Sequence, residues 1–584
     1  MKVTVKFLQE NYVKKEVMIP MRDGVRLYTA VYEPKGAQAR PVIVIRTPFP
    51  LNPYGKTFTR DLRTYMSLFA ANKYIIVWQN VRGKFMSEGE FVNVRPLGGL
   101  VDEATDTYDT AQWLTENLNT NGCIGVKGMS YPGFYATMAA LSGHPAIKAV
   151  SPQAPVTDWF MGDDVHISGL GQPATYSFGA SFFRPRKACG IRWPSPVVNL
   201  PQGDIYDAFL DLDGRPLESL RDRLPFVEEM MQHPSYDSFW KERNAAAALK
   251  GNLPAFLVVA GLFDAEDSYG PFEVYRSLRA QAPQTESFLC VGPWYHGAWK
   301  KAGYTALGDA YFTPGSTEHF MQEIEFPFFE HYLAGGEALP PRVSVLPSAE
   351  TTKDGPKPCW KSYDSWPPMQ EDLALYLCPN QNLPAAEYAK DRFIARCDGL
   401  LSPEPVAAPA SVAFTSNPLR PVPYVDGPME YFSREAFVAD QRFAARRQDV
   451  FVFSTGVLHS PVKVEGKVSI DLNISIDKED ADIVVKLIDV RPDGYQLPVR
   501  IGAIPVRFRD SFDMPLPARP GECYLINVPL TDVAHHFEVG HRIMVQIQST
   551  MFPLIQLPEC KDRVEVSLHC GPLTATALHL PVVK

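Results

Sequence analysis

The chain has 584 residues, of which 57 are Lys or Arg and 66 are Asp or Glu, giving a formal net charge of −9 at pH 7. This acidic balance excludes the basic surface typical of nucleic-acid-binding proteins, so we expect no nucleic-acid partner. A chain of this length should fold as two or three domains rather than around one core.

The sequence also indicates the cellular compartment and the role of the cysteines. No stretch approaches the roughly 20 apolar residues of a membrane span, and the first residues lack the apolar segment of a signal peptide. We therefore expect no membrane partner and a cytoplasmic protein, or a periplasmic or secreted one if a signal peptide has been removed. The nine cysteines include no C-x-x-C pair, so neither a zinc site nor a disulfide framework is predicted.

The amino-terminal part of the chain alternates predicted strands with predicted helices. Residues 16–28 read as two strands around an Asp-Gly pair at 23–24, which predicts a β-hairpin. Strands follow at residues 42–45 and 74–78, and the apolar positions of residues 102–118 recur at helical spacing. This alternation predicts a mostly parallel sheet.

The most informative motif is G-M-S-Y-P-G at residues 128–133, which follows an apolar run at 123–127. A serine on a tight strand-to-helix turn exposes its hydroxyl and directs the next backbone N–H at a developing oxyanion, as an acyl-transferring nucleophile requires. The motif departs from the strict G-x-S-x-G, because Pro132 stands where the second glycine belongs. Ser130, with the backbone N–H of Tyr131, becomes a catalytic candidate only if a base and an acid follow in the chain.

Two later strands supply that acid and that base. Residues 256–261 form an apolar run that is followed by Asp264, and residues 287–292 form another that leads to His296. The order Ser, Asp, His, with each residue at the carboxyl end of its own strand, is that of the α/β-hydrolases. We expect Ser130 to be the nucleophile, His296 its base and Asp264 the acid that orients the base, with no metal and no organic cofactor.

Composition divides the rest of the chain. Residues 159–248 lack strand patterns, segments such as 217–232 are predicted to be helical, and we interpret this insertion as a cap over the site. After about residue 340, proline is frequent and short alternating runs such as 468–476 predict an all-β jelly roll. The predicted fold is an α/β hydrolase with an inserted helical cap and a C-terminal jelly-roll domain. Its predicted boundaries are 1–158 and 249–340 for the hydrolase domain, 159–248 for the cap and 341–584 for the jelly roll.

Several spaced motifs give the chain a family resemblance. They are R-T-P at residues 46–48, Q-N-V-R-G-K at 79–84, S-E-G-E at 87–90, the serine motif, and G-P-W-Y-H at 292–296. In this order they resemble the X-Pro dipeptidyl-peptidase and cocaine-esterase family of serine hydrolases, over nearly the whole chain. Within that family the chain is most similar to the α-amino acid ester hydrolases, which cleave and transfer α-amino acyl groups, including those of β-lactam antibiotics.

This resemblance implies a carboxylate cluster formed by Asp164, Glu266 and Asp267. In the α-amino acid ester hydrolases, three acids at matching positions hold the substrate ammonium, which lies only a few ångströms from the scissile carbonyl. The alternative is that Glu266 and Asp267 merely stabilise a helix N-terminus, where acids are favourable. Without a ligand, three carboxylates packed together should repel one another, and at least one should titrate high.

One residue departs from the family pattern. Family members usually carry a tyrosine directly after R-T-P, where its hydroxyl joins the N–H after the nucleophile in stabilising the oxyanion, but this chain has Phe49. Three explanations are open: Tyr54 supplies the hydroxyl from a shifted loop, the enzyme works with one donor, or Phe49 is an introduced substitution. We favour Phe49 in the tyrosine's place, with the donor missing.

The expected substrate is a small-molecule ester or amide whose acyl group carries an α-amine, and homo-oligomerisation is left open. Candidates for its pocket wall are the aromatic residues near the motifs, namely Tyr131, Trp159, Phe160 and Trp294. Two alternatives remain. One is a dipeptidyl-peptidase or carboxylesterase of the same family without a required α-amine, and the other is a binding protein on a catalytically weak hydrolase scaffold.

Overall fold

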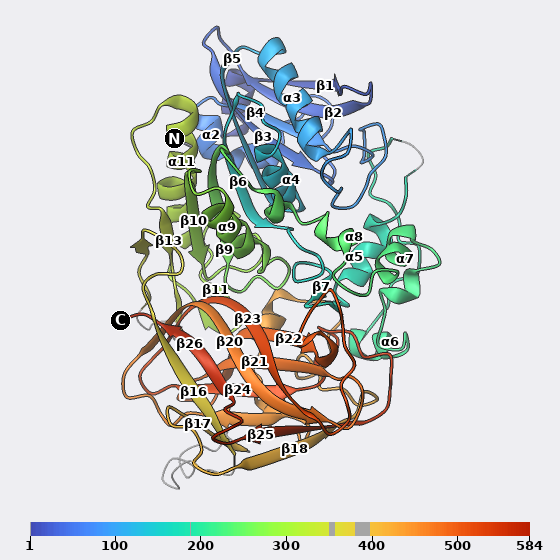
Figure 1. The fold of residues 1–584 in the computed structure, drawn as a ribbon. Helices are drawn as coiled ribbons and strands as arrows, with labels where there is room; N and C mark the ends of the chain where they lie inside the picture. Colours follow the sequence, from blue (N-terminus) through green and yellow to red (C-terminus); the bar gives the residue numbers. More distant parts are fainter. Residues whose placement is uncertain (1, 187–188, 350–356, 380–396) are drawn as a thin grey trace.

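A ten-stranded sheet organises the N-terminal half of the protein (Figure 1). The computed structural model describes residues 2–186, 189–349, 357–379 and 397–584. Neighbouring strands from β4 to β13 run parallel, whereas the pairs β1–β2, β2–β4 and β13–β15 are antiparallel. In spatial order the strands are β1 (Tyr12–Pro20), β2 (Arg26–Pro34), β4 (Ile75–Asn80), β3 (Arg40–Thr47), β5 (Thr120–Ser130), β6 (Ile147–Pro155), β9 (Ala255–Gly261), β10 (Ser287–Gly292), β13 (Val343–Val345) and β15 (Lys361–Tyr363).

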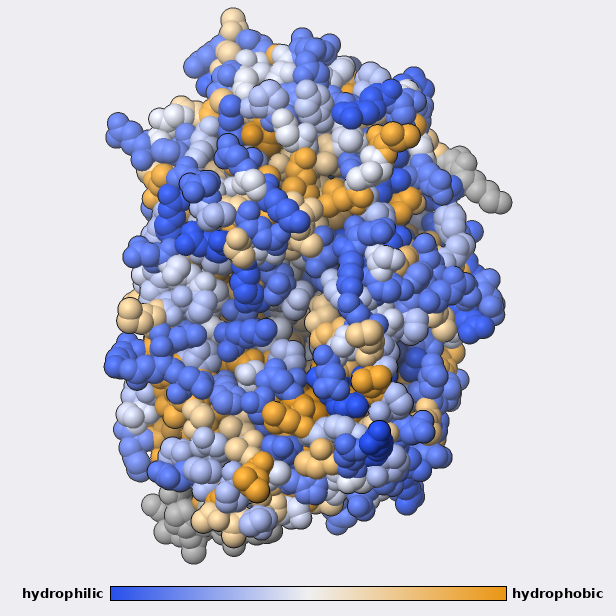
Figure 2. Space-filling model, viewed as in Figure 1, coloured by the Kyte–Doolittle hydropathy of each residue, from blue (hydrophilic) through white to orange (hydrophobic). Residues whose placement is uncertain are grey.

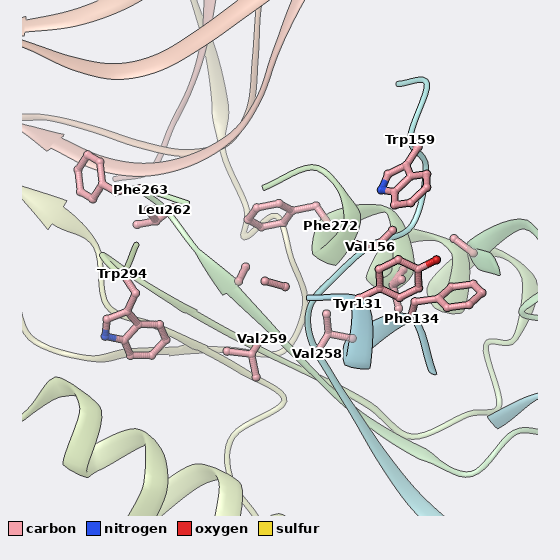
Figure 3. Close-up of a cluster of buried hydrophobic side chains, with 14 of the residues drawn as sticks. Tyr131, Phe134, Val156, Trp159, Val258, Val259, Leu262, Phe263, Phe272 and Trp294 are labelled. Atoms are coloured by element: carbon pink, nitrogen blue, oxygen red, sulfur yellow. The ribbon is translucent and has the colours of Figure 1, made fainter. Parts of the chain in front are cut away.

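Strands β9 and β10 are almost entirely apolar because both of their faces are covered. Every residue of β9 and β10 is buried, which is typical of parallel strands between layers. Figure 3 shows Val258 of β9 on the side of Tyr131 and Phe134, and Val259 on the side of Trp294. The aromatic residues that flank the serine and histidine motifs therefore belong to the packed core around β9.

Helices connect and cover these strands. The helix after β4 is capped by Asp102, whose side chain accepts the backbone N–H of Thr105 at 2.8 Å. All ten residues of the helix after β5 are buried. The helical elements of this half are α1 (Val5–Asn11), η1 (Arg60–Arg63), α2 (Ser67–Ala71), α3 (Glu103–Asn117), α4 (Tyr131–Ala140), η3 (Ala245–Ala248), α9 (Gly270–Gln281), η4 (Ala298–Lys300), α10 (Ser316–His319), η5 (Phe320–Glu325) and α11 (Phe326–Ala334). A two-stranded hairpin, β11 (Ala306–Leu307) and β12 (Ala310–Tyr311), follows η4.

Between β6 and β9 the chain leaves the sheet and forms the cap, drawn in teal to green in Figure 1. The cap starts with a small hairpin that the sequence did not reveal, because each of its strands is only two residues long. The predicted helical segment 217–232 consists of two pieces, and Pro225 opens the second one at a position where a missing N–H does no harm. The cap elements are β7 (His166–Ile167), β8 (Leu170–Gly171), α5 (Thr175–Phe182), α6 (Ile205–Leu210), η2 (Glu218–Leu220), α7 (Pro225–Met231) and α8 (Ser238–Lys241).

A curled twelve-stranded sheet forms the C-terminal domain, at the bottom of Figure 1. Long strands β20 and β23 pair antiparallel, with a register shift between Val468 and Ser469 that bends the sheet. The strands are β14 (Ser348–Ala349), β16 (Glu371–Pro379), β17 (Gly399–Ser402), β18 (Ala410–Ser416), β19 (Phe451–Ser454), β20 (Val462–Ile476), β21 (Asp482–Val490), β22 (Gln496–Pro505), β23 (Cys523–Phe537), β24 (Arg542–Gln548), β25 (Val564–Cys570) and β26 (Ala577–Val582). Short helical segments η6 (Arg434–Val438), α13 (Arg442–Ala445) and η7 (Val506–Phe508) connect them. The predicted fold class, an α/β hydrolase with a C-terminal all-β domain, is confirmed.

The chain does not change from the first sheet to the second at a single boundary at residue 341. Strands β13 and β15 follow that residue but extend the first sheet beside β10, whereas β14, between them in sequence, pairs with β23 of the second sheet. The sequence of such short strands does not indicate which sheet they join, because they have no alternating pattern and their pairing depends on which sheet edge is free.

The face drawn in Figure 2 is mostly hydrophilic, with apolar atoms in scattered groups. Among the described residues, no helix combines the length and the apolar character needed to cross a lipid bilayer.

Candidate active site

Ser130 lies at a sharp turn between β5 and α4. Its backbone has φ 66° and ψ −128°, and its hydroxyl does not cap the helix that follows. A positive φ at a residue other than glycine costs on the order of 1–3 kcal/mol, and such strained positions cluster at functional sites. The turn is permitted by its glycines: a Cβ at Gly128 would lie 2.0 Å from the Pro132 carbonyl oxygen, and one at Gly133 would lie 2.8 Å from Pro155 Cα. The close approach that normally requires the second glycine of the motif thus falls one position later, at Gly133.

Asp264 and His296 form a buried hydrogen-bonded pair. His296 Nδ1 lies 2.8 Å from Asp264 Oδ2, while Asp264 Oδ1 accepts the backbone N–H groups of Glu266 at 2.9 Å and Asp267 at 3.0 Å. Burial raises the pKa of Asp264, but the charge and hydrogen bond of His296 outweigh it, and the pKa ends below its usual value. The side chain that orients the ring is therefore a carboxylate held by three donors.

Ser130 and His296 line one cavity of about 340 Å³, to which Phe49 and Glu266 also contribute. A second cavity of about 280 Å³ shares Ser130, Phe49 and Glu266 with the first. Because β5, β9 and β10 end at the same edge of the sheet, residues far apart in sequence meet there. The serine thus stands where two pockets join, as a nucleophile between an acyl group and a leaving group would.

The three acids carried over from the resemblance come together beside the histidine. Asp164 donates its backbone N–H to the Glu266 carbonyl oxygen at 2.9 Å, which joins the cap to the loop after β9. Glu266 Oε2 lies 3.6 Å from His296 Nε2, and Asp267 Oδ2 lies 3.9 Å from His296 Nδ1. Asp164 and Glu266 line the second cavity.

This cluster is short of positive charge. Asp267 is fully buried, and within the described ranges neither of its carboxyl oxygens has a hydrogen-bond partner. Burial, followed by the charges of Asp164 and Asp163, raises the pKa of Asp267 well above its usual value, and burial with the charge of Glu266 raises the pKa of Asp164 to about 7. The arrangement is what a cationic ligand would complete.

Comparisons with known proteins show the family of the chain. The X-Pro dipeptidyl-peptidase (S15 family) model matches residues 23–298, and the X-Pro dipeptidyl-peptidase C-terminal non-catalytic domain model matches residues 337–571. Cocaine esterase of Rhodococcus sp. (strain MB1 Bresler) is 30% identical, over 98% of this chain and 99% of its own. The chain belongs to the X-Pro dipeptidyl-peptidase (S15) family. It is a serine hydrolase of the esterase and peptidase class.

Two solved structures resemble this S15-family hydrolase over its whole length. An α-amino acid ester hydrolase has a TM-score of 0.86 at 30% identity, covering 98% of this chain and 97% of its own. An aminopeptidase from the marine sediment archaeon Thaumarchaeota archaeon has a TM-score of 0.85 at 32% identity, with the same coverage. The cap and the C-terminal domain are included in both likenesses.

Phe49 of this S15-family hydrolase lines the same two cavities as Ser130, whereas Tyr54 lines neither. Phe49 lines both cavities beside Ser130, and its ring packs on Phe182 at 5.9 Å and on Trp193 at 6.1 Å. Tyr54 is absent from the lining of either cavity and packs instead on Tyr28, with ring centroids 5.5 Å apart. The position beside the serine is therefore occupied by a ring without a donor.

Of the four aromatic residues predicted to form the pocket wall, two line a cavity and two do not. Trp159 and Tyr131 line the second cavity, although both are almost fully buried. Phe160 lines neither cavity and packs on Phe508 at 5.7 Å, and Trp294 lies in the core against Trp299 at 5.9 Å. Aromatic residues next to a motif in sequence are more often core than pocket wall, because consecutive side chains point in different directions.

Several polar residues of the site gave no signal in the sequence. Asp163 accepts backbone N–H groups from Thr157 at 3.0 Å and Gly270 at 2.9 Å, and so anchors the start of the cap. In the first cavity, Lys127 pairs with Glu325 at 2.5 Å, and both side chains are buried. Lysine inside an apolar strand and a second aspartate beside a first are not patterns that point to a site.

Proposed function

We propose that this hydrolase cleaves or transfers α-amino acyl groups of esters and amides. The observation that carries the proposal is the acid cluster: Asp164 and Glu266 share a cavity with Ser130, and Asp267 is buried beside them with no hydrogen-bond donor among the described residues. A substrate ammonium would supply both the hydrogen-bond donors and the positive charge that these carboxylates lack. The likeness to a solved α-amino acid ester hydrolase and a solved aminopeptidase supports the same assignment.

Acylation uses the buried pair behind the serine. His296 takes the proton of the Ser130 hydroxyl as the oxygen attacks the carbonyl carbon. The His296 Nδ1–H donates to Asp264 Oδ2, which holds the ring in place. The backbone N–H of Tyr131 donates to the oxyanion. When the tetrahedral intermediate collapses, His296 returns the proton to the leaving oxygen or nitrogen and an acyl-serine ester remains.

Deacylation repeats these steps with a second nucleophile. Water, or an amine when acyl transfer occurs, loses a proton to His296 and attacks the acyl-serine carbonyl, and Ser130 leaves as the restored alcohol. The ammonium of the acyl group stays at Asp164 and Glu266 throughout, so the same contacts orient the substrate in both halves of the reaction.

The wall of the acyl pocket favours a large apolar side chain. Besides the acids, the cavity of about 280 Å³ is lined by Trp159, Phe178 and Phe183. Aromatic rings around a charged anchor suit an α-amino acyl group that itself carries an aromatic or branched side chain.

A matched pair of esters tests the proposal. Phenylglycine methyl ester and its des-amino analogue, methyl phenylacetate, differ only in the amine, so we expect kcat/KM to be much higher for the former. Asp164→Asn should reduce that preference by about 1.5–3 kcal/mol, the worth of one charged hydrogen bond. Asp207→Asn, at an exposed acid elsewhere in the cap, serves as the control. Equal losses on both esters would contradict the proposal and favour a carboxylesterase like the cocaine esterase relative.

A further inference from the structure

A network of buried hydrogen bonds connects the loop of His296 to the strands beside Ser130. Its central residue is Gln153 on β6, which pairs in register with Met129, the residue before Ser130. The Trp299 indole N–H, in η4, donates to Gln153 Oε1 at 2.9 Å. Trp299 lies three residues after His296. This hydrogen bond therefore ties the loop of the proposed base to the sheet beside the proposed nucleophile.

The side-chain amide of Gln153 is held in one orientation. An indole N–H can only donate, so the amide oxygen must face Trp299. The amide nitrogen then donates to Glu325 Oε1 at 2.5 Å and to Ser151 Oγ at 3.2 Å. The reversed amide would set its oxygen against the Glu325 carboxylate, where two acceptors repel each other. The contacts on both sides of Gln153 thus require the same orientation.

Glu325 extends the network to the strand of Ser130 itself. It is the last residue of η5, a π-helix, which is a rare element that frequently lies at functional sites. Glu325 Oε1 also accepts from Lys127 Nζ, and Lys127 lies on β5 three residues before Ser130. All four side chains of the network, Lys127, Gln153, Trp299 and Glu325, are buried. Breaking a hydrogen bond in such a place is costly, so the network is rigid.

The His296 loop also contacts the Ser130 strand directly. Gly297, the residue after His296, has φ 77°, and a Cβ on it would lie 2.7 Å from Met129 Sδ. This packing contact prevents the loop from moving closer to the strand, and the hydrogen bond from Trp299 prevents it from moving away. The two contacts together fix the position of the loop.

We propose that Gln153 is a positioning residue: by holding Trp299, it sets the distance between His296 Nε2 and the Ser130 hydroxyl. This role rests on the triad of the proposed function. Asp264 fixes the orientation of the imidazole ring, whereas Gln153 fixes where the loop of that ring stands relative to the nucleophile. Proton transfer requires a short, aligned contact between base and serine, and a misplacement of about 1 Å can cost about 10²-fold in rate.

Gln153→Met tests this role, because methionine fills a similar volume and offers the indole at most a weak acceptor. We expect kcat to fall about 10- to 100-fold, with KM little changed and by the same factor for phenylglycine methyl ester and methyl phenylacetate. Labelling by a fluorophosphonate should slow to a similar extent. Gln153 also lines the first cavity, so a higher KM with unchanged kcat would assign it to substrate binding and overturn the proposal.

A tryptophan of the cap provides the control for a merely structural loss. The buried Trp240 donates its indole N–H to the His233 carbonyl oxygen at 2.8 Å and lines neither cavity of the site. Trp240→Phe should lower Tm and leave kcat unchanged. Trp299→Phe, which removes the donor and keeps an aromatic ring, should lower kcat as Gln153→Met does.

The double variant decides whether the two residues act through their hydrogen bond. Gln153→Met combined with Trp299→Phe should be no slower than the slower single variant, since both changes break the same bond. Losses that multiply would overturn the proposal. If Trp299→Phe does not fold, Gln153→Met carries the test, and wild-type kcat and labelling in that variant would overturn the positioning role alone. Equal kcat/KM of the wild type for the two esters would instead contradict only the α-amine preference.

Discussion

Glu266 Oε2 lies 3.6 Å from His296 Nε2, the ring nitrogen that Asp264 does not engage. Burial lowers the pKa of His296, but the charges of Asp264 and Glu266 outweigh it and raise that pKa to about 9. A histidine with such a pKa is protonated at neutral pH and cannot accept the serine proton. An ammonium held by the acid cluster would offset the negative charge and return the ring to its basic form.

This relationship predicts a pH dependence that differs between substrates. With saturating methyl phenylacetate, activity should rise through an acid limb centred near pH 9, because the base must lose its proton. With saturating phenylglycine methyl ester, the acid limb of kcat should lie at lower pH, since the bound ammonium lowers the pKa of His296. The measurement is the kcat profile from pH 5 to 10 for both esters.

Glu266→Gln provides the internal check on that prediction. The substitution removes a charge that raises the pKa of His296, so the acid limb with methyl phenylacetate should move to lower pH. Glu318→Gln, at a half-buried acid that accepts the Gly303 N–H, should leave the profile in place. Coincident kcat profiles for the two esters would show that the acid cluster does not control the base.

Ser130→Ala is expected to abolish covalent labelling by a fluorophosphonate and to lower ester turnover by several orders of magnitude, because triad residues act as a unit. The circular dichroism spectrum should not change, since the hydroxyl does not cap α4. Ser142→Ala, at a serine whose hydroxyl donates to the Ala139 carbonyl oxygen, is the matched control. Normal burst-phase acylation by Ser130→Ala would mean that another residue is the nucleophile.

Phe49→Tyr should raise the turnover number on esters by up to about 10²-fold, because a donor aimed at the oxyanion acts mainly in the transition state. Tyr54→Phe should have little effect, since Tyr54 packs on Tyr28 outside both cavities. Steady-state kinetics of the two variants decide the matter. If Phe49→Tyr is silent and Tyr54→Phe is severely impaired, Tyr54 reaches the oxyanion by a rearrangement of its loop.

We expect the buried ion pair between Lys127 and Glu325 to affect stability strongly only when one of its two partners is removed. Glu325→Gln leaves the Lys127 ammonium uncompensated and should cost about 3–5 kcal/mol of stability, seen as a lower Tm by calorimetry. Lys127→Met combined with Glu325→Gln should recover much of the loss. Glu323→Gln, at an exposed neighbour in η5, should change Tm little. If Glu325→Gln and Glu323→Gln lower Tm by similar amounts, loss of the ion pair is not the cause.

The fold could be predicted from the sequence where periodicity is strong. The apolar runs that became β9 and β10, and the ordered motifs after them, identify the α/β hydrolase and its family. The small hairpin at His166–Ile167 and the transfer of strands between sheets after residue 340 could not be predicted, because two- and three-residue strands carry no pattern.

For the site, the sequence identified candidate residues but not the residues that pack around them. Asp164, Glu266 and Asp267 meet as the family resemblance implied, while their catalytic and binding roles stay predictions. The positions of Phe160 and Trp294 in the core depend on packing between distant segments. Such long-range contacts leave no trace in local composition.

The left-handed backbone of Ser130 implies that this enzyme is not at its stability optimum. Glycine adopts φ near +66° without strain, so Ser130→Gly should relieve the turn, although part of that gain is lost to the greater freedom of the unfolded chain. The Ser130→Gly protein would then withstand heat better than the wild type. Selection for thermal tolerance alone would therefore favour loss of the Ser130 hydroxyl, so any programme to stabilise this protein needs turnover as a second criterion.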